Sequence, residues 1–186
     1  MLKNFACLYL LLFLSLTSIL FSSPIANAQG CRQLTASDFQ GKVDSKSPFV
    51  SQVKLRIGYH STILKRGDSY HVTFHVFLDV NPGESWIKFD KIKSSEMLSE
   101  VLNHEQGHFK IGCLMQRELI NRLNARKYTS HYKQEAATLF NKISRKYQTM
   151  QLKYDTETDH MRNQKQQAIW DGKLNRSIGN VKTLRD

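Results

Sequence analysis

The 186-residue sequence is poor in the residues that mark unstructured or fibrous proteins. It has three prolines and nine glycines, too few for a collagen-like chain or a low-complexity linker. Acidic residues are also scarce, with 16 Asp and Glu against 27 Lys and Arg. Hydrophobic residues make up 40% of the chain and aromatic residues 10%, which is enough for one packed core. The composition therefore predicts a single basic globular domain.

An uncharged apolar run near the N-terminus does not belong to that domain. Residues 6–21 follow Lys3 and lead to an Ala-Asn-Ala site at residues 26–28. This order is typical of a secretory signal peptide. The run is short for a membrane span and contains hydroxyl side chains, which disfavours a membrane anchor. We therefore expect residues 1–28 to be a signal peptide and residues 29–186 to form an exported domain, periplasmic or secreted.

Cysteine is rare, and one of the three, Cys7, lies within the expected signal peptide. The remaining pair, Cys31 and Cys113, is favoured to form a disulfide because exported proteins reach an oxidising compartment. Such a bridge would close a loop of roughly 80 residues and contribute about 4–5 kcal/mol to stability. Two free thiols are the next alternative. Lipidation of Cys31 ranks last, because the sequence before it lacks the usual Leu and lies well past the apolar run.

The first half of the domain has the pattern of β-strands. Within residues 50–89, apolar and polar side chains alternate with a period of two along residues 53–59 and again along residues 70–80. A turn is expected at residues 66–69, and residues 85–89 could form a short third strand. The first half therefore predicts a small antiparallel sheet.

The second half has the spacing of α-helices. After plausible N-caps at Ser94 and Ser95, apolar residues recur at helical intervals to about Ala125. A second long helix is expected over about residues 131–161, and a shorter one over residues 164–171. Strands followed by helices predict an α+β fold with two long helices and a short one in a single domain.

The first predicted helix contains the sequence HEQGH, in which His104 and His108 lie four residues apart. On a helix these residues project about 40° apart, so both imidazoles can reach one zinc ion. Glu105, beside them, could act as the general acid/base for a metal-activated water. The spacing therefore predicts a catalytic zinc site.

Gly107 lies inside this motif, where a glycine costs about 1 kcal/mol relative to alanine in a helix. Apolar residues Val101, Leu102 and Phe109 surround it, which indicates that this turn is buried or half-buried. We therefore expect another segment of the chain to approach the helix closely at Gly107.

A catalytic zinc needs a third protein ligand and an open position for water. The candidates lie in residues 154–160. On a continuous helix Glu157 would face the first helix better than His160, but His160 could reach the metal if the helix ends early. Asp155 is a further carboxylate that could bind the metal or support a ligand. Tyr154 is the best candidate for a hydrogen-bond donor to the transition state.

Three stretches resemble the predicted secreted zinc-dependent protease family of bacteria, formerly listed as a bacterial domain of unknown function. They are LTASDFQG at residues 34–41, HEQGHFKI at residues 104–111 and YDTETDH at residues 154–160. The similarity covers about residues 34–170, which we take as the core of the domain.

This resemblance implies a zincin-like domain with His104 and His108 as zinc ligands and Glu105 as the base. It also implies His160 as the third ligand in preference to a carboxylate. The family usually has glycine directly after that histidine, whereas this chain has Met161.

These features predict an exported, zinc-dependent, peptidase-like hydrolase that acts on a peptide or protein substrate in the cell envelope. The alternative is a non-catalytic envelope-binding module with a structural zinc site. Glu105 favours the enzyme, because a structural site needs no base and fills the fourth position with a protein ligand.

The excess of Lys and Arg predicts at most a weak, salt-dependent association with anionic envelope surfaces. Nucleic acid is disfavoured as a partner, because the chain has no base-stacking or groove-reading motif and is expected to be exported.

Overall fold

The computed structural model describes residues 31–67 and 69–179, so the predicted signal peptide lies outside the described residues. Its strands all precede its long helices, which confirms the α+β class. The strands are β1 (Ser51–Gln52), β2 (Leu55–Arg66), β3 (Ser69–Val80) and β4 (Trp86–Ile87). The helices are α1 (Ser95–Asn124), α2 (Tyr132–Thr158) and α3 (Gln164–Gly179), with 3₁₀ turns at Ala36–Asp38 and Phe89–Lys91.

Strands β2 and β3 form a long antiparallel hairpin, paired from Leu55 opposite Val80 to Arg66 opposite Ser69. This register confirms the predicted turn. Along β3, Phe74, Leu78 and Val80 are buried and Val76 is half-buried, whereas His75, Phe77 and Asp79 are exposed. Because side chains alternate across a strand, one face of the hairpin joins the core and the other meets solvent.

The predicted third strand does not join this hairpin. Only Trp86 and Ile87 are extended, and β4 pairs with β1 in a separate two-stranded sheet. The chain is turned away after β3 because the main-chain N–H of Ser85 donates to the carbonyl of Asn81. The Ser85 side chain then accepts a hydrogen bond from the main-chain N–H of Lys54, which joins this turn to the start of β2. The single small sheet expected from the sequence is therefore two.

Helix α1 begins and ends close to the residues that the sequence predicts. Its start is fixed by an N-cap, because the Ser94 side chain accepts a hydrogen bond from the main-chain N–H of Met97. Helix α2 ends at Thr158, three residues before the predicted end, because Asp159 has a left-handed backbone. Helix α3 runs eight residues beyond the predicted end at residue 171. Its last turn receives hydrogen bonds from Arg117 of α1, a tertiary contact that the local sequence does not reveal.

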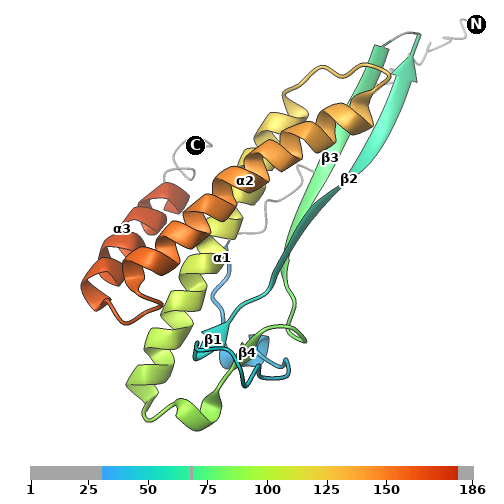
Figure 1. Ribbon diagram of the computed structural model, residues 1–186. Helices are drawn as coiled ribbons and strands as arrows, with labels where there is room; N and C mark the ends of the chain where they lie inside the picture. The colour runs from blue at the N-terminus through green and yellow to red at the C-terminus, as the bar shows by residue number, and fades with distance from the viewer. Residues whose placement is uncertain (1–30, 68, 180–186) are drawn as a thin grey trace, which may run out of the picture.

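Helix α1 is the centre of the fold. Helix α2 runs antiparallel along α1, and α3 packs beside both. The β2–β3 hairpin lies along the other side of these helices (Figure 1). Core residues on α1 include Ile111, Leu119 and Leu123, which have no exposed surface. No helix in the described part of the chain is long and apolar enough to cross a membrane.

The structure confirms the predicted pairing of Cys31 with Cys113 in a disulfide. The bridge ties the segment before the first 3₁₀ turn to the middle of α1, 82 residues later. Phe109 of α1 and Leu34 lie in the same buried cluster as the bridge. The disulfide therefore fixes the N-terminal segment against the helix that carries the HEQGH motif.

Candidate metal centre

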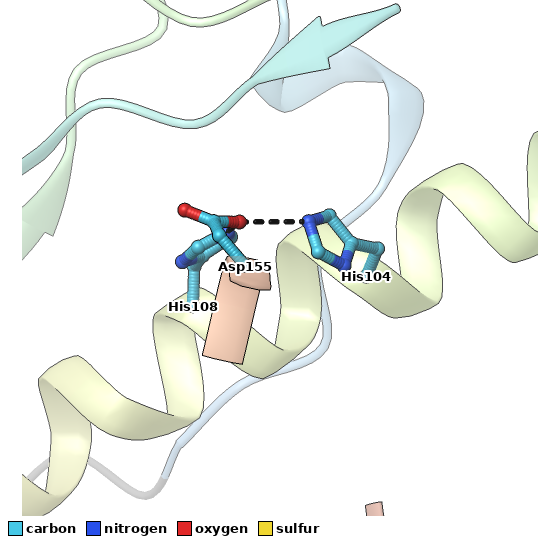
Figure 2. A group of neighbouring side chains, drawn as sticks. All are labelled: His104, His108 and Asp155. Atoms are coloured by element: carbon cyan, nitrogen blue, oxygen red, sulfur yellow. Dashed lines mark hydrogen bonds and ion pairs between the residues drawn. The ribbon is translucent and has the colours of Figure 1, made fainter. Parts of the chain in front are cut away.

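Three side chains from two helices converge on one point. His104 and His108 lie one turn apart on α1, and Asp155 faces them from α2 (Figure 2). The Nε2 atom of His108 is 2.9 Å from Asp155 Oδ1, and that of His104 is 3.3 Å from the same oxygen. The ligand atoms of all three residues lie within 4.8 Å of one another.

Helix α2 can approach this turn of α1 because Gly107 has no side chain there. A Cβ atom at this position would overlap the ring and hydroxyl of Tyr154, closer than real Cβ atoms pack. The Tyr154 hydroxyl donates a hydrogen bond to the main-chain carbonyl of His104, 3.0 Å away, and its ring stacks on the His104 imidazole. The close approach expected at Gly107 is therefore confirmed, and it places Asp155 beside the histidines.

Two glutamines fix how the imidazole rings are turned. Gln167 on α3 uses its amide nitrogen to donate to Tyr154, which leaves its oxygen 3.2 Å from His104 Nδ1. Gln151 on α2 donates its amide nitrogen to the main-chain carbonyl of His108, and its oxygen faces His108 Nδ1. Because each amide oxygen can only accept a hydrogen bond, Nδ1 carries a proton in both rings, and Nε2 carries a second one only in the imidazolium form. Both Nε2 atoms are thereby turned toward Asp155.

The electrostatics of this cluster favour ionised Asp155. Burial opposes its ionisation, but hydrogen bonds from His104 and His108 hold its pKa well below the usual range. Burial by itself would lower the pKa of His108, yet the hydrogen bond to Asp155 and the charges of Glu105 and Asp155 raise it. The site therefore stabilises positive charge next to the carboxylate.

Glu105 is buried and its carboxylate contacts the segment that includes β1. One oxygen accepts a hydrogen bond from the Ser51 hydroxyl at 2.5 Å, and the other accepts one from the main-chain N–H of Val53 at 2.9 Å. These contacts hold residues 51–53 against α1. An ionised carboxylate has about four acceptor positions, so two remain after these bonds are made.

His160 lies next to the cluster and outside the helix. Asp159, His160 and Met161 have consecutive positive φ angles of 49°, 48° and 74°. This turn places His160 Nδ1 3.5 Å from Asp155 Oδ1, and the ring packs against Phe49 at a centroid distance of 4.1 Å. The early end of α2 thus brings His160 toward the site, although Asp155 is the residue that joins both histidines.

Two other predicted site residues have different partners. Glu157 accepts a hydrogen bond from the indole N–H of Trp170 and pairs with Lys153, and it is not part of the three-residue cluster. Tyr154 is fully buried, and burial raises its pKa well above the usual value. Its proton is already donated to His104, so the expectation that Tyr154 donates to a transition state is corrected to a structural role.

The cluster opens into a pocket of about 660 Å³ between α1, α2 and residues 48–53. His104, Glu105, His108 and Asp155 line it, as does His160. The pocket therefore places the carboxylate of Glu105 in the same cavity as the three converging side chains. A ligand in this cavity would contact α1, α2 and residues 48–53.

Ser51, Gln151 and Gln167 are site residues that were not predicted from the sequence. Gln151 lies four residues before Asp155 on the same helix, a spacing that places both side chains on one face. That spacing could have revealed Gln151. Ser51 and Gln167 are far from the motif in sequence and have no local signal, so only the fold reveals their contacts.

The three converging residues fit a zinc ion. Zinc in proteins is bound by imidazole nitrogen and carboxylate oxygen at about 2.0–2.2 Å, so neighbouring ligand atoms in a tetrahedral site lie about 3.3 Å apart. The distances from Asp155 Oδ1 to the two imidazole nitrogens are 2.9 and 3.3 Å. The donor types are thus those of a zinc site, and these two distances agree with a tetrahedral arrangement, while all three ligand atoms lie within 4.8 Å of one another.

A model of the family described as "Bacterial protein of unknown function (DUF922)" matches residues 32–161, most of the chain. The matched region contains the HEQGH motif, Asp155 and His160. No curated protein and no solved structure matches the chain.

Proposed function

We propose that this chain, which belongs to the bacterial family of unknown function DUF922, is an exported zinc-dependent hydrolase of peptide or amide bonds. The main support is the convergence of two imidazole Nε2 atoms and one carboxylate oxygen in a pocket that Glu105 also lines. Two histidines and a carboxylate form a donor set of catalytic zinc sites, which keep one position for water. His104, His108 and Asp155 would hold the metal. The Cys31–Cys113 disulfide supports export to an oxidising compartment.

When bound, zinc would lower the pKa of a water molecule and polarise the carbonyl of the bond to be cut. Glu105 would take a proton from the attacking water through a free acceptor position and later return it to the leaving amine. Its hydrogen bonds to Ser51 and Val53 would hold the carboxylate in place during both transfers. Gln151 and Gln167 would keep each imidazole turned toward the metal.

The substitution Glu105→Gln tests the catalytic role. Purified mature protein should contain zinc and cleave members of a fluorogenic peptide library in a chelator-sensitive manner. The variant should retain the same zinc content while its rate falls by about 10²–10⁴-fold, the usual contribution of a general base. Unchanged hydrolysis in the variant, or parent protein that binds no zinc, would refute this proposal.

A second experiment identifies the third ligand. Isothermal titration with zinc after chelation should show a loss of at least tenfold in affinity for Asp155→Ala, because a ligand is lost. Glu157→Ala should bind zinc as the parent does, since Glu157 contacts Trp170 instead. If His160→Ala lowers the affinity and Asp155→Ala does not, the ligand is the one that the family resemblance implies. If neither variant changes affinity, the proposed site is wrong.

One observation favours the alternative of a non-catalytic envelope-binding module. Both oxygens of Glu105 accept hydrogen bonds from residues 51–53, so Glu105 also has a structural role in joining this segment to α1. The variant Ser51→Ala removes one of these bonds and leaves the carboxylate intact. If Ser51→Ala and Glu105→Gln lower the unfolding free energy equally, and the parent cleaves nothing, the module is the better description.

A further inference from the structure

The end of the β2–β3 hairpin has two large apolar side chains that the core does not cover. The hairpin continues past the start of α2 and beyond the helices (Figure 1). Ile63 and Leu64 lie in this part of β2, with exposed fractions of 42% and 52%. Because they are consecutive in a strand, they point to opposite faces of the hairpin. Packing against one face could not bury both, and neither belongs to a core cluster.

Basic residues surround this apolar pair. The loop between α1 and α2 lies beside the hairpin, because Tyr70 of β3 forms a β-bridge with Tyr128 of that loop. We call residues 61–73 and 125–135 together the hairpin tip. Its charged residues are Lys65, Arg66, Arg126, Lys127 and Lys133 against Asp68 and Glu135, a net charge of 5 − 2 = +3. Among the described residues, only Arg126 of these cations has an ion-pair partner, which is Glu135.

Two tyrosines join the apolar pair to these cations. Tyr70 stacks on Tyr132 at the start of α2 with ring centroids 6.2 Å apart, and Lys65 Nζ lies 5.6 Å from the centre of the Tyr70 ring. Both tyrosines are half-buried. Tyrosine is enriched at the boundary between lipid head groups and hydrocarbon, because its ring is apolar and its hydroxyl is polar. A lysine beside it can bury its methylene groups and keep its ammonium among the head groups.

This combination fits an anionic lipid bilayer better than a soluble acidic partner. An acidic protein or polymer would attract the cations of the hairpin tip but leave Ile63 and Leu64 in water. A bilayer offers phosphate groups to the cations and hydrocarbon to the apolar pair, and both contributions increase the affinity for the membrane.

The other end of α1 exposes apolar surface without an excess of positive charge. Phe89 lies just before this helix, and its exposed fraction of 49% is close to those of Ile63 and Leu64. Residues 84–100 around it contain three lysines and four acidic residues. Exposed apolar side chains are therefore present at both ends, but the hairpin tip combines them with net positive charge. This difference predicts which end faces a membrane.

We infer that the hairpin tip binds the surface of an anionic lipid bilayer, with Ile63 and Leu64 entering the boundary of the hydrocarbon and the cations contacting lipid phosphates. The weak association predicted from composition is thereby assigned to one surface. The binding needs neither a metal nor turnover, so it is independent of the proposed function. From Lys133 to Asp155, α2 rises about 33 Å. The pocket of the candidate metal centre would therefore stay clear of the lipid.

Sedimentation with sucrose-loaded vesicles measures this binding for the purified mature protein. Vesicles of equal parts phosphatidylglycerol and phosphatidylcholine should bind it at least tenfold more tightly than vesicles of phosphatidylcholine alone. Added salt should weaken the binding, because it screens the charges of the lipid and the protein. Equal binding to the two kinds of vesicle, or no binding to either, would refute the inference.

The double substitution Ile63→Asn with Leu64→Asn tests the apolar contribution. It should lower the affinity for the anionic vesicles at least tenfold, because two apolar side chains no longer leave water. Phe89→Asn is the matched control and should bind as the parent does. Circular dichroism checks that each variant is folded. If the double variant binds as tightly as the parent, the surface recognises anionic polymers in general, and the assignment to a bilayer is wrong. If Phe89→Asn weakens binding instead, the opposite end faces the membrane.

The double substitution Lys65→Gln with Arg66→Gln tests the charge contribution. A basic residue near an anionic surface contributes about a factor of five to affinity, so this variant should bind at least tenfold more weakly. Lys91→Gln with Lys93→Gln removes the same charge at exposed positions near the start of α1 and should change affinity by less than about twofold. Equal losses in the two variants would mean that net charge alone attracts the protein, which overturns the inference.

Tryptophan fluorescence tests whether the hairpin tip enters the bilayer. Leu64→Trp should be quenched by anionic vesicles whose lipids are brominated on the acyl chains, whereas Phe89→Trp should not. The native Trp86 and Trp170 are buried, so their emission can be subtracted with the parent protein. Quenching at both positions, or at neither, would exclude insertion of the hairpin tip.

Discussion

The side chain of Tyr154 occupies the space that Gly107 leaves free in the middle of α1. Its hydroxyl donates to the carbonyl of His104, and the next residue, Asp155, faces both histidines. The glycine of the HEQGH motif and the carboxylate on α2 are therefore linked by one close helix contact. This contact determines whether side chains from two helices far apart in sequence can meet in the proposed metal site.

Replacing Gly107 with Ala should destabilise the protein by about 1–3 kcal/mol, because overpacking outweighs the gain in helix propensity. It should also lower zinc affinity by moving α2 and Asp155 away from α1. Gly172→Ala is the matched control on α3, where a Cβ atom meets only the end of the Arg176 side chain. Chemical denaturation and zinc titration measure both effects. A Gly107→Ala protein as stable as the parent would contradict the contact described here.

The glutamines behind the histidines should tune metal binding without touching the metal. Gln151→Leu and Gln167→Leu each remove a hydrogen bond to an imidazole Nδ1, and we expect each to lower zinc affinity by about 10–100-fold. Gln166→Leu, at a half-buried position of α3 with no hydrogen bond to either imidazole among the described residues, is the control and should bind zinc as the parent does. Equal zinc affinities in all three variants would show that the rings need no such support.

Met161 is held at a φ of 74°, a conformation that costs side-chain-bearing residues about 1–2 kcal/mol. Glycine adopts this conformation without the penalty. This agrees with the glycine that usually occupies the position in the family that the chain resembles. Met161→Gly and Met161→Ala both remove the side chain, so their comparison isolates the backbone effect. Denaturation should show the Gly variant to be more stable than the Ala variant by about 1 kcal/mol. The reverse order would mean that this turn relaxes to another backbone conformation.

Stability at acidic pH should depend on Asp38. The hydrogen bond from Arg32, opposed by partial burial, lowers the pKa of Asp38 below its usual value. A carboxyl with a lowered native pKa stabilises the fold above its unfolded pKa of about 3.9 and loses that contribution as the pH falls through the native pKa. Denaturation of Asp38→Asn should therefore differ most from the parent above about pH 5 and least below pH 3. Asp90→Asn, at an exposed position, should show no such pH-dependent difference.

The local pattern of the sequence was sufficient for the α+β class, the hairpin turn and the limits of α1, because side-chain periodicity and N-caps act over a few residues. It also identified His104, Glu105 and His108 together, since one helical turn sets their spacing. The close approach at Gly107 followed from the cost of a glycine within a helix. Each of these depends on interactions between residues near one another in the chain.

Other features depended on segments far apart in the chain. Tertiary hydrogen bonds, which leave no local pattern in the sequence, determine three of them. These are the pairing of β1 with β4, the length of α3 and the contacts of Gln167. Among the candidates in residues 154–160, the helical periodicity favoured Glu157 and the family resemblance favoured His160, but the packing of Tyr154 against Gly107 turns Asp155 toward the histidines.

The sequence by itself determined which chemical groups are available on α1, because their spacing is a property of one helix. Only the tertiary structure decided which groups of α2 and α3 meet them, because that depends on how closely three helices pack and how their rings are hydrogen-bonded.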